Sequence, residues 1–164
     1  MTEPTGPDGQ GGCNAEDVAL LDQWHTVYSG FRRLTHELLA DVESETGVAP
    51  SSFEVLWFLV MRPTRAAQMH QLSTVLGFST AGTTKVVDRL AEAGLVERRP
   101  SPSDRRVTLA VLTPVGAEVA ANAAQILSQA LRQRVLVPLG SEGFTGLAAA
   151  VATLGADSQG CPEG

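Results

Sequence analysis

Four arginines flank a short proline-containing segment in the second half of the sequence, and their charge suits them to bind a polyanion. They are Arg98, Arg99, Arg105 and Arg106. Pro100 and Pro102 restrict the backbone between them, which should hold the charges away from the body of the protein. A β-ribbon tip with arginines fits the minor groove of duplex DNA, where the negative potential deepens as the groove narrows.

Asp104 lies in the same segment and has no place in a simple phosphate-binding patch. We expect its carboxylate to orient a neighbouring guanidinium through a charge-assisted hydrogen bond. The alternative is that Asp104 pairs with an arginine only to close the turn. Under the first interpretation Asp104 belongs to the candidate DNA-contacting set together with the arginines.

A helix expected over Ser79–Ala93 presents a second surface that suits DNA. Its inward face carries Val86, Leu90 and Ala93, and short or polar side chains occupy the opposite face. These outward residues are Thr80, Ala81, Thr84, Lys85 and Asp88. Short side chains let a helix sit deep in the major groove, where hydroxyls bond base edges, a methyl group meets thymine and a lysine reaches a phosphate or a guanine.

Ser79 is the expected N-cap of that helix, and the free N–H groups at this end suit a phosphate. Arg89, the other basic residue of the helix, joins the candidate DNA-contacting set. Because helix-turn-helix units also serve as structural or docking modules, a protein-interaction module without DNA binding is the alternative function. Such a module would show an indifferent charge pattern on the helix and the ribbon.

The charge distribution favours DNA over that alternative. The whole chain has a formal net charge of −6, which by itself argues against a nucleic-acid binder. However, eight of the twelve basic residues and only four of the eighteen acidic ones lie between Arg62 and Thr113. Non-specific affinity for DNA depends on the local face presented to the phosphates, so this segment can bind DNA although the chain is acidic.

The periodicity of apolar residues predicts a mainly α fold with a small β-ribbon wing. Helices are expected at 15–46, 50–62, 68–76, 79–93, 114–137 and 141–154, and Gly47, Pro63 and Pro138 should end three of them. Leu95–Arg99 and Val107–Leu112 read as the strands of an antiparallel ribbon. This order predicts a winged helix-turn-helix over 50–113 between long terminal helical regions, 15–46 and 114–154.

We expect residues 15–154 to form a single domain, and the glycine-rich ends, 1–14 and 155–164, to be disordered tails. The long terminal helices carry more apolar surface than the small central unit could cover. The most economical partner for this surface is the same surface of a second chain, so the terminal helices should form the dimerisation region of a homodimer.

An ordered series of short motifs lies between about Pro50 and Val119: Leu72–Gly77, Ser79 with Val86–Leu90, Gly94–Arg98, Asp104–Arg106 and Leu112–Gly116. This series resembles the MarR family of transcriptional regulators. The resemblance implies a dimer built from the terminal helices, a recognition helix at Ser79–Ala93 and a wing whose Asp-x-Arg element falls on Asp104 and Arg106. By that match Arg106 is the best candidate for insertion into the minor groove, and Arg105 is a close second.

The same resemblance implies repression that a small effector relieves, commonly a phenolic or other aromatic anion. Family members that sense peroxides carry a reactive cysteine in the first long helix, whereas Trp24–Ser29 has none. An effector pocket is expected where the first two helices meet the DNA-binding unit. Aromatic walls and a cation that would suit a carboxylate come from Tyr28, Arg32, His36 and Trp57. The alternative is that Tyr28 and Trp57 are core residues and that the stem of Arg32 covers apolar surface.

Other functions fit the sequence poorly. No nucleophile elbow, phosphate-binding glycine loop or His/Cys cluster is present, and Glu43 and Glu45 do not face each other on a helix, so no enzyme is expected. The three histidines lack metal-ligand spacing, and no metal or cofactor is expected. Cys13 and Cys161 read as incidental surface thiols, with a redox-sensing pair as the alternative.

The sequence also argues against a membrane protein. The longest unbroken apolar stretch, Val55–Met61, is too short to span a bilayer. No Lys or Arg precedes Arg32, whereas a secretory signal requires a basic start. The cytoplasm is therefore the expected location.

Overall fold

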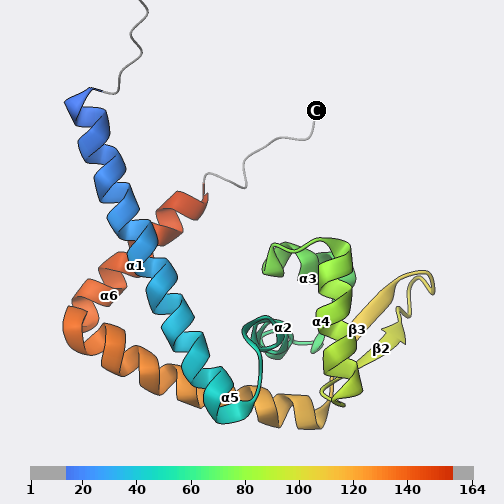
Figure 1. Ribbon diagram of the computed structural model, residues 1–164. Helices are drawn as coiled ribbons and strands as arrows, with labels where there is room; N and C mark the ends of the chain where they lie inside the picture. Colours follow the sequence, from blue (N-terminus) through green and yellow to red (C-terminus); the bar gives the residue numbers. More distant parts are fainter. Residues whose placement is uncertain (1–13, 157–164) are drawn as a thin grey trace, which may run out of the picture. The chain divides into compact units, whose positions relative to one another are not determined.

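The computed structural model describes residues 14–156 (Figure 1). Two compact units divide the chain, residues 1–37 and residues 38–164. The disordered tails predicted at 1–14 and 155–164 lie almost entirely outside the described residues, as do Cys13 and Cys161.

The first unit consists, in its described part, of most of helix α1 (Ala15–Thr46). Asn14 caps this helix, because its Oδ1 accepts a hydrogen bond from the backbone N–H of Asp17 (2.8 Å). The expected long amphipathic helix is therefore present. Large apolar side chains of this unit are exposed: Val18, Leu20, Leu21, Trp24, Val27, Tyr28 and Phe31.

The second unit contains the helix-turn-helix and the wing. After the end of α1 come α2 (Pro50–Val60), β1 (Ala66–Gln68), α3 (Met69–Leu76), α4 (Thr80–Glu92), β2 (Val96–Pro100) and β3 (Thr108–Leu112). The described part of the chain ends with α5 (Pro114–Leu131), a π-helical turn (Arg132–Leu136) and α6 (Val137–Ala156). The core of the second unit is formed by fully buried side chains of α2, α3, α4 and β2, among them Leu56, Leu59, Leu72, Val87 and Val96.

The wing belongs to a three-stranded antiparallel sheet of order β1-β3-β2, and β1 was not predicted. Strand β1 is three residues long and pairs through Ala66 with Val111 and through Gln68 with Leu109. The turn before it requires Arg65 to adopt a left-handed backbone conformation (φ 50°), and the carbonyl of Arg65 accepts from Leu112 N (2.8 Å). So short a strand shows no alternation in the sequence.

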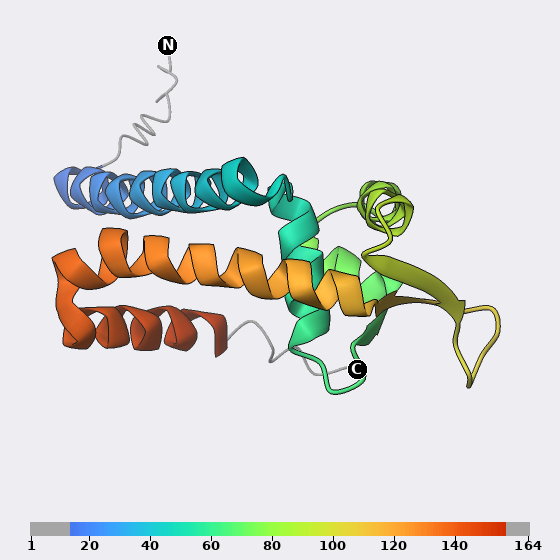
Figure 2. The same cartoon turned by 90° about the horizontal axis from the view of Figure 1, so that it is seen from below.

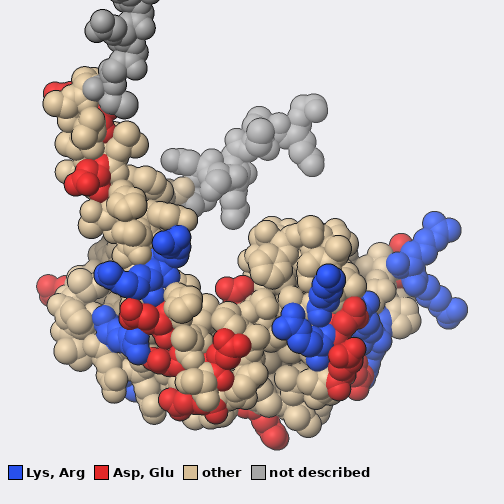
Figure 3. All heavy atoms as spheres, viewed as in Figure 1, with Lys and Arg blue, Asp and Glu red and all other residues tan. Residues whose placement is uncertain are grey.

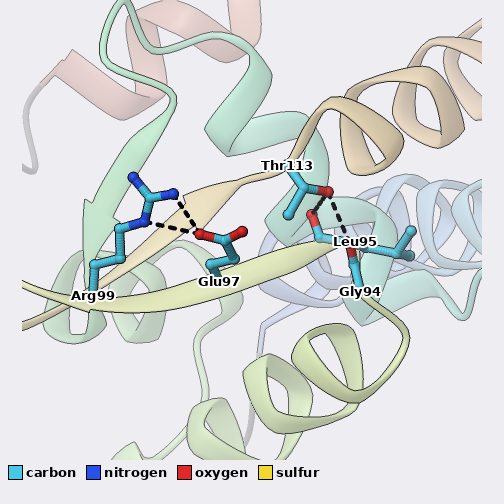
Figure 4. Close-up of polar contacts among 5 residues, drawn as sticks. All are labelled: Gly94, Leu95, Glu97, Arg99 and Thr113. Atoms are coloured by element: carbon cyan, nitrogen blue, oxygen red, sulfur yellow. Dashed lines mark hydrogen bonds and ion pairs between the residues drawn. The ribbon is translucent and has the colours of Figure 1, made fainter.

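Thr113 joins the base of the wing to helix α5 (Figure 4). Its hydroxyl donates to the carbonyl oxygens of Gly94 (2.8 Å) and Leu95 (3.1 Å), and accepts from Gly116 N (2.9 Å) as the N-cap of α5. Gly116 lies so close to Leu95, the residue before β2, that a Cβ atom there would be 2.0 Å from its carbonyl oxygen. The start of the last helical region is thereby fixed to the wing.

The prediction that Pro138 ends a helix is wrong by two residues. The π-helical turn shifts the hydrogen-bonding pattern, with Val137 N donating to the carbonyl of Arg132, and Pro138 lies in the first turn of α6, where its missing N–H is tolerated. The break occurs at Gly140 (φ 71°, ψ 167°), a conformation that the absence of a Cβ permits. Figure 2 shows the chain turning back between α5 and α6.

The stretch Pro114–Leu154 is the one helix among the described residues that is long and apolar enough to cross a membrane. This conclusion rests on length and composition alone and is weak evidence for a membrane span. Very little of the stretch is buried within the chain, and its exposed apolar side chains include Val137, Leu139, Phe144, Val151 and Leu154.

Candidate nucleic-acid interface

Helix α4 carries the outward face that the sequence predicted. Ser79 caps it, with Oγ accepting from Gly82 N (3.2 Å). Thr80, Ala81 and Lys85 are exposed, whereas Thr84 is half-buried. The short side chains at the start of the helix are therefore accessible to a duplex.

The inward face of α4 differs in three positions from the prediction. Val86 and Leu90 are buried as expected, together with Val87 and Thr83. The Thr83 hydroxyl, which sequence reasoning missed, donates to the carbonyl of Ser79 (3.1 Å) and so has its hydrogen bond inside the core. Ala93, predicted to point inward, is exposed because the helix ends at Glu92 and Ala93 is its C-cap.

The wing is a hairpin whose loop projects from the second unit (Figures 1 and 2). Strands β2 and β3 pair from Val96 with Leu112 to Pro100 with Thr108. Hydrogen bonds from Ser101 N to the carbonyl of Val107 (2.8 Å) and from Val107 N to the carbonyl of Asp104 (3.0 Å) order the loop. The expected ribbon with a polar, basic tip is therefore present.

The prediction that the Asp104 carboxylate orients a guanidinium is wrong. Its Oδ1 accepts instead from the backbone N–H of Arg106 (2.9 Å). A short acidic side chain two residues before that N–H forms an Asx turn, which competes well with longer-range pairing because it is local. Asp104 thus closes the turn through the main chain, and the side chains of Arg105 and Arg106 are both exposed.

The four arginines of the wing fall into two pairs with different surroundings. Arg98 makes an ion pair with Asp88 of α4 (Nη2 to Oδ1, 2.6 Å) and donates to the carbonyl of Thr84 (3.5 Å). Arg99 pairs with Glu97, with Nε 2.8 Å from the carboxylate (Figure 4). Arg105 and Arg106 form no ion pair with any residue in the described part of the chain. These two arginines are the free charges of the wing.

Asp88 belongs to the predicted outward face of α4, and its ion pair with Arg98 was not predicted. Figure 3 shows basic side chains at the end of the wing and acidic ones interspersed with basic ones over α4 and β2. Of the other candidates, Lys85 is exposed, and Arg89 lines a hollow of about 350 Å³ with Glu43, at the end of α1. The structure therefore places Arg89 beside α1 and away from the wing loop.

The residues of the expected effector pocket lie in different units. Tyr28, Arg32 and His36 are in the first, where the Arg32 Cζ lies 5.9 Å from the centroid of the Tyr28 ring. Trp57 is in the second and stacks on Phe53 with 6.3 Å between ring centroids. Tyr28 is 54% exposed and Trp57 41%, so the alternative that both are core residues is wrong for the single chain. A common pocket stays a prediction.

Comparison with known proteins assigns the chain to a family. The sequence model of a protein family, described as MarR family, matches residues 46–107 of the chain. The multiple antibiotic resistance protein MarR of Escherichia coli (strain K12) is 31% identical over 111 residues, which are 68% of this chain and 73% of that protein. The chain belongs to the MarR family.

Further comparisons show that the fold is shared with a regulator solved in complex with DNA and that the sequence resembles a transcriptional repressor. A MarR family transcriptional regulator from Streptomyces coelicolor, solved in complex with DNA, has a TM-score of 0.77 at 25% identity and covers 93% of this chain and 94% of its own. The transcriptional repressor MprA of Escherichia coli (strain K12) is 35% identical over 72 residues, 44% of this chain and 41% of that protein. As a MarR-family member, this protein is a DNA-binding transcriptional regulator with a winged helix-turn-helix, and not an enzyme.

Proposed function

We propose that this protein is a dimeric repressor that binds a pseudo-palindromic operator and is released from it by a small effector. The observation that carries the proposal is the free pair of arginines, Arg105 and Arg106, on a projecting wing that an ion pair between Arg98 and Asp88 joins to α4. Repression is supported by the likeness to MprA, a transcriptional repressor. As a regulator of transcription, the protein would act in the cytoplasm.

In this proposal α4 reads bases and the wing reads the neighbouring minor groove. Thr80, Ala81, Thr84 and Lys85 contact base edges or phosphates in the major groove, and the capped helix start at Ser79 receives a phosphate. Arg106 enters the minor groove with Arg105 beside it. Arg98 and Asp104 act by holding the wing in place, and Arg89 and Arg99 add positive charge to the surface.

Dimerisation is supported by the apolar surface that the single chain leaves exposed. Val18, Trp24 and Phe31 on α1 and Phe144 and Val151 on α6 are all exposed. So many large apolar side chains on the surface indicate a protein partner, and a second copy is the simplest one. A dimer would set the two recognition helices about one helical turn of DNA apart, about 34 Å.

The experiment begins with duplexes selected by the wild-type protein from a randomised library. Selected sites should contain two inverted half-sites, and fluorescence anisotropy at physiological salt should show that Arg106→Ala weakens binding at least tenfold. The matched control is Arg33→Ala, which removes an exposed arginine of α1 and should leave the affinity unchanged. Light scattering should give twice the monomer mass for both variants. Wild-type affinity in Arg106→Ala would disprove the wing assignment, and a monomeric mass would disprove the dimer.

A further inference from the structure

The corner between α3 and α4 (Figure 1) carries a large apolar side chain, Phe78, which is 46% exposed. Phe78 lies outside the hydrophobic core of the second unit, and it makes no aromatic or cation–π contact with any described residue. Single exposed apolar side chains are common on proteins, so exposure alone assigns no role. The position of Phe78 on the DNA-binding unit does.

The backbone on both sides of Phe78 is held in place. Gly77, the C-cap of α3, adopts a left-handed conformation (φ 63°) that ends this helix. Ser79 is extended and caps α4, because its Oγ accepts from the backbone N–H of Gly82. Phe78 therefore occupies the position directly before the N-cap of α4, and the ends of two helices fix where its side chain begins.

The side chain of Phe78 lies beside Gly82. A Cβ atom at Gly82 would be 3.4 Å from the Cβ of Phe78 and 3.8 Å from the Cδ2 of its ring. A residue at the position of Phe78 often packs against an apolar side chain at the fourth residue of the helix. That residue is Thr83 here, and its hydroxyl donates to the carbonyl of Ser79. The usual apolar partner of such a ring is therefore missing.

Gly82 places the ring at one edge of the outward face of α4. Residues three apart on a helix are neighbours, so Gly82 adjoins the exposed Lys85. The wing contacts α4 at Thr84 and Asp88. With 3.6 residues per turn, Gly82 lies about 200° around the helix from Thr84. Phe78 and the wing therefore border the outward face from opposite edges.

The chain around Phe78 is uncharged. No Asp, Glu, Lys or Arg occurs from Gln71 to Thr84, so this corner offers no side-chain charge to phosphates. It offers instead an aromatic ring beside the exposed start of a helix. In the major groove, the 5-methyl group of thymine is the apolar group on the base edges, and phenylalanine is among the side chains that contact it.

We propose that Phe78 is a specificity-determining residue whose ring contacts the 5-methyl group of a thymine in each half-site, at the edge of α4 away from the wing. The inference rests on the proposed function, in which α4 lies in the major groove. The contact favours thymine because no other unmodified base carries a methyl group there. DNA is favoured over a protein partner because the ring is continuous with the exposed residues Thr80 and Ala81 at the start of α4.

The test removes the methyl group from the DNA. In a duplex selected by the wild-type protein, each thymine is replaced in turn by deoxyuridine, which lacks only the 5-methyl group. Fluorescence anisotropy should show one position in each half-site at which the wild type loses affinity about fourfold, as expected for one methyl-sized apolar group. Phe78→Ala should lose nothing further at that position. Thymines that other side chains such as Ala81 contact should respond equally in both proteins.

Further variants define the contact. Phe78→Leu keeps an apolar side chain and should retain part of the response to the methyl group, whereas Phe78→Ser should retain none. The matched control is Met61→Ala, which removes another exposed apolar side chain at the C-cap of α2 and should respond as the wild type does. If Phe78→Ala lost affinity equally for thymine and uracil at every position, the ring would contact the sugar–phosphate backbone, and the proposal would be overturned. Unchanged affinity throughout would also overturn it and would leave the ring as a protein-binding surface.

The same titrations separate this inference from the proposed function. If Arg106→Ala weakens binding but Phe78→Ala keeps the wild-type response to uracil at every position, the inference fails and the proposed function stands. If the selected duplexes lack inverted half-sites but one uracil position depends on Phe78, the dimeric repressor fails and the contact stands.

Discussion

Arg98 of the wing and Asp88 of α4 form an ion pair of 2.6 Å, and this pair joins the two elements that we propose to bind DNA. The same guanidinium reaches the carbonyl of Thr84, one helical turn earlier on α4. Arg98 therefore contacts α4 on the outward side, at Thr84 and Asp88. Buried side chains of β2 and α4 share one core, and the contacts of Arg98 are the polar side-chain link between the wing and α4 among the described residues.

We predict that Asp88→Ala lowers operator affinity although it removes a negative charge from the DNA-binding surface. If Asp88 acted only through long-range electrostatics, its removal would raise the affinity for DNA. If Asp88 positions the wing, its removal instead lowers the affinity for the operator. Fluorescence anisotropy with wild type, Asp88→Ala, Arg98→Ala and the double variant decides between them. The two single changes should lower affinity non-additively.

The pair should contribute little to the stability of the folded protein itself. Its side chains are 35% and 50% exposed, so urea unfolding of the four variants should give a coupling free energy of about 0.5 kcal/mol, near the value typical of exposed pairs. The matched control is the more exposed pair of Arg99 and Glu97, for which both the stability coupling and the operator coupling should be close to zero. A larger effect on unfolding than on DNA binding would contradict the positioning role.

Two substitutions of Asp104 separate its role as a hydrogen-bond acceptor from the role of its charge. Asn keeps an oxygen that can accept from Arg106 N, so Asp104→Asn should retain the turn and bind the operator at least as tightly as the wild type. Asp104→Ala loses the acceptor and should weaken binding several-fold, because the loop that carries Arg105 and Arg106 is no longer held. Both variants are compared by anisotropy. If Asn were as harmful as Ala, the carboxylate charge would matter, and the interpretation that Asp104 orients a guanidinium would return.

The sequence predicted well those features that local residue types determine. The cap at Ser79, the amphipathic face of α4 and the two strands of the wing all follow from neighbouring residues and their period. The sequence did not reveal strand β1, which forms only because β3 offers it an edge. It could not reveal the pairing of Asp88 with Arg98 either, since ten positions separate them and the contact depends on how β2 packs on α4.

The prediction that Pro138 ends a helix was wrong for a similar reason, because it considered local residue types alone. Pro138 is the strongest helix breaker in its region, and a sequence rule ends the helix there. The π-helical turn before it shifts the hydrogen-bonding pattern, with Val137 N bonded to the carbonyl of Arg132, and the chain stays helical through Pro138. The break falls on Gly140, which needs no special environment for its positive φ. The effector pocket expected from Tyr28, Arg32, His36 and Trp57 depends on contacts between distant parts of the chain, and stays a prediction for the same reason.

Gly116 should be the least replaceable glycine among those of the described helices. A Cβ at this position would meet the backbone carbonyl of Leu95 at 2.0 Å, and neither β2 nor α5 can move without breaking the bonds of Thr113. We expect Gly116→Ala to lower the free energy of unfolding by roughly 3 kcal/mol or more. Gly146 of α6 has open space around it, so Gly146→Ala should raise that free energy by about 0.5–1 kcal/mol. Urea denaturation of both variants measures the difference.

Arg105 and Arg106 should differ in what they recognise, although both are exposed and unpaired among the described residues. An arginine inside the minor groove senses groove width, which depends on A·T content, whereas an arginine on the backbone senses only phosphate charge. We predict that Arg106→Ala removes the preference for A·T pairs at the positions under the wing. Arg105→Ala should instead weaken binding equally for all duplexes and reduce the slope of log affinity against log salt by about 0.9. Anisotropy titrations with A·T and G·C versions of the selected site, at three salt concentrations, separate the two effects. If the two variants showed the same salt slope and the same base preference, the arginines would share one role, and the placement of Arg106 in the groove would be wrong.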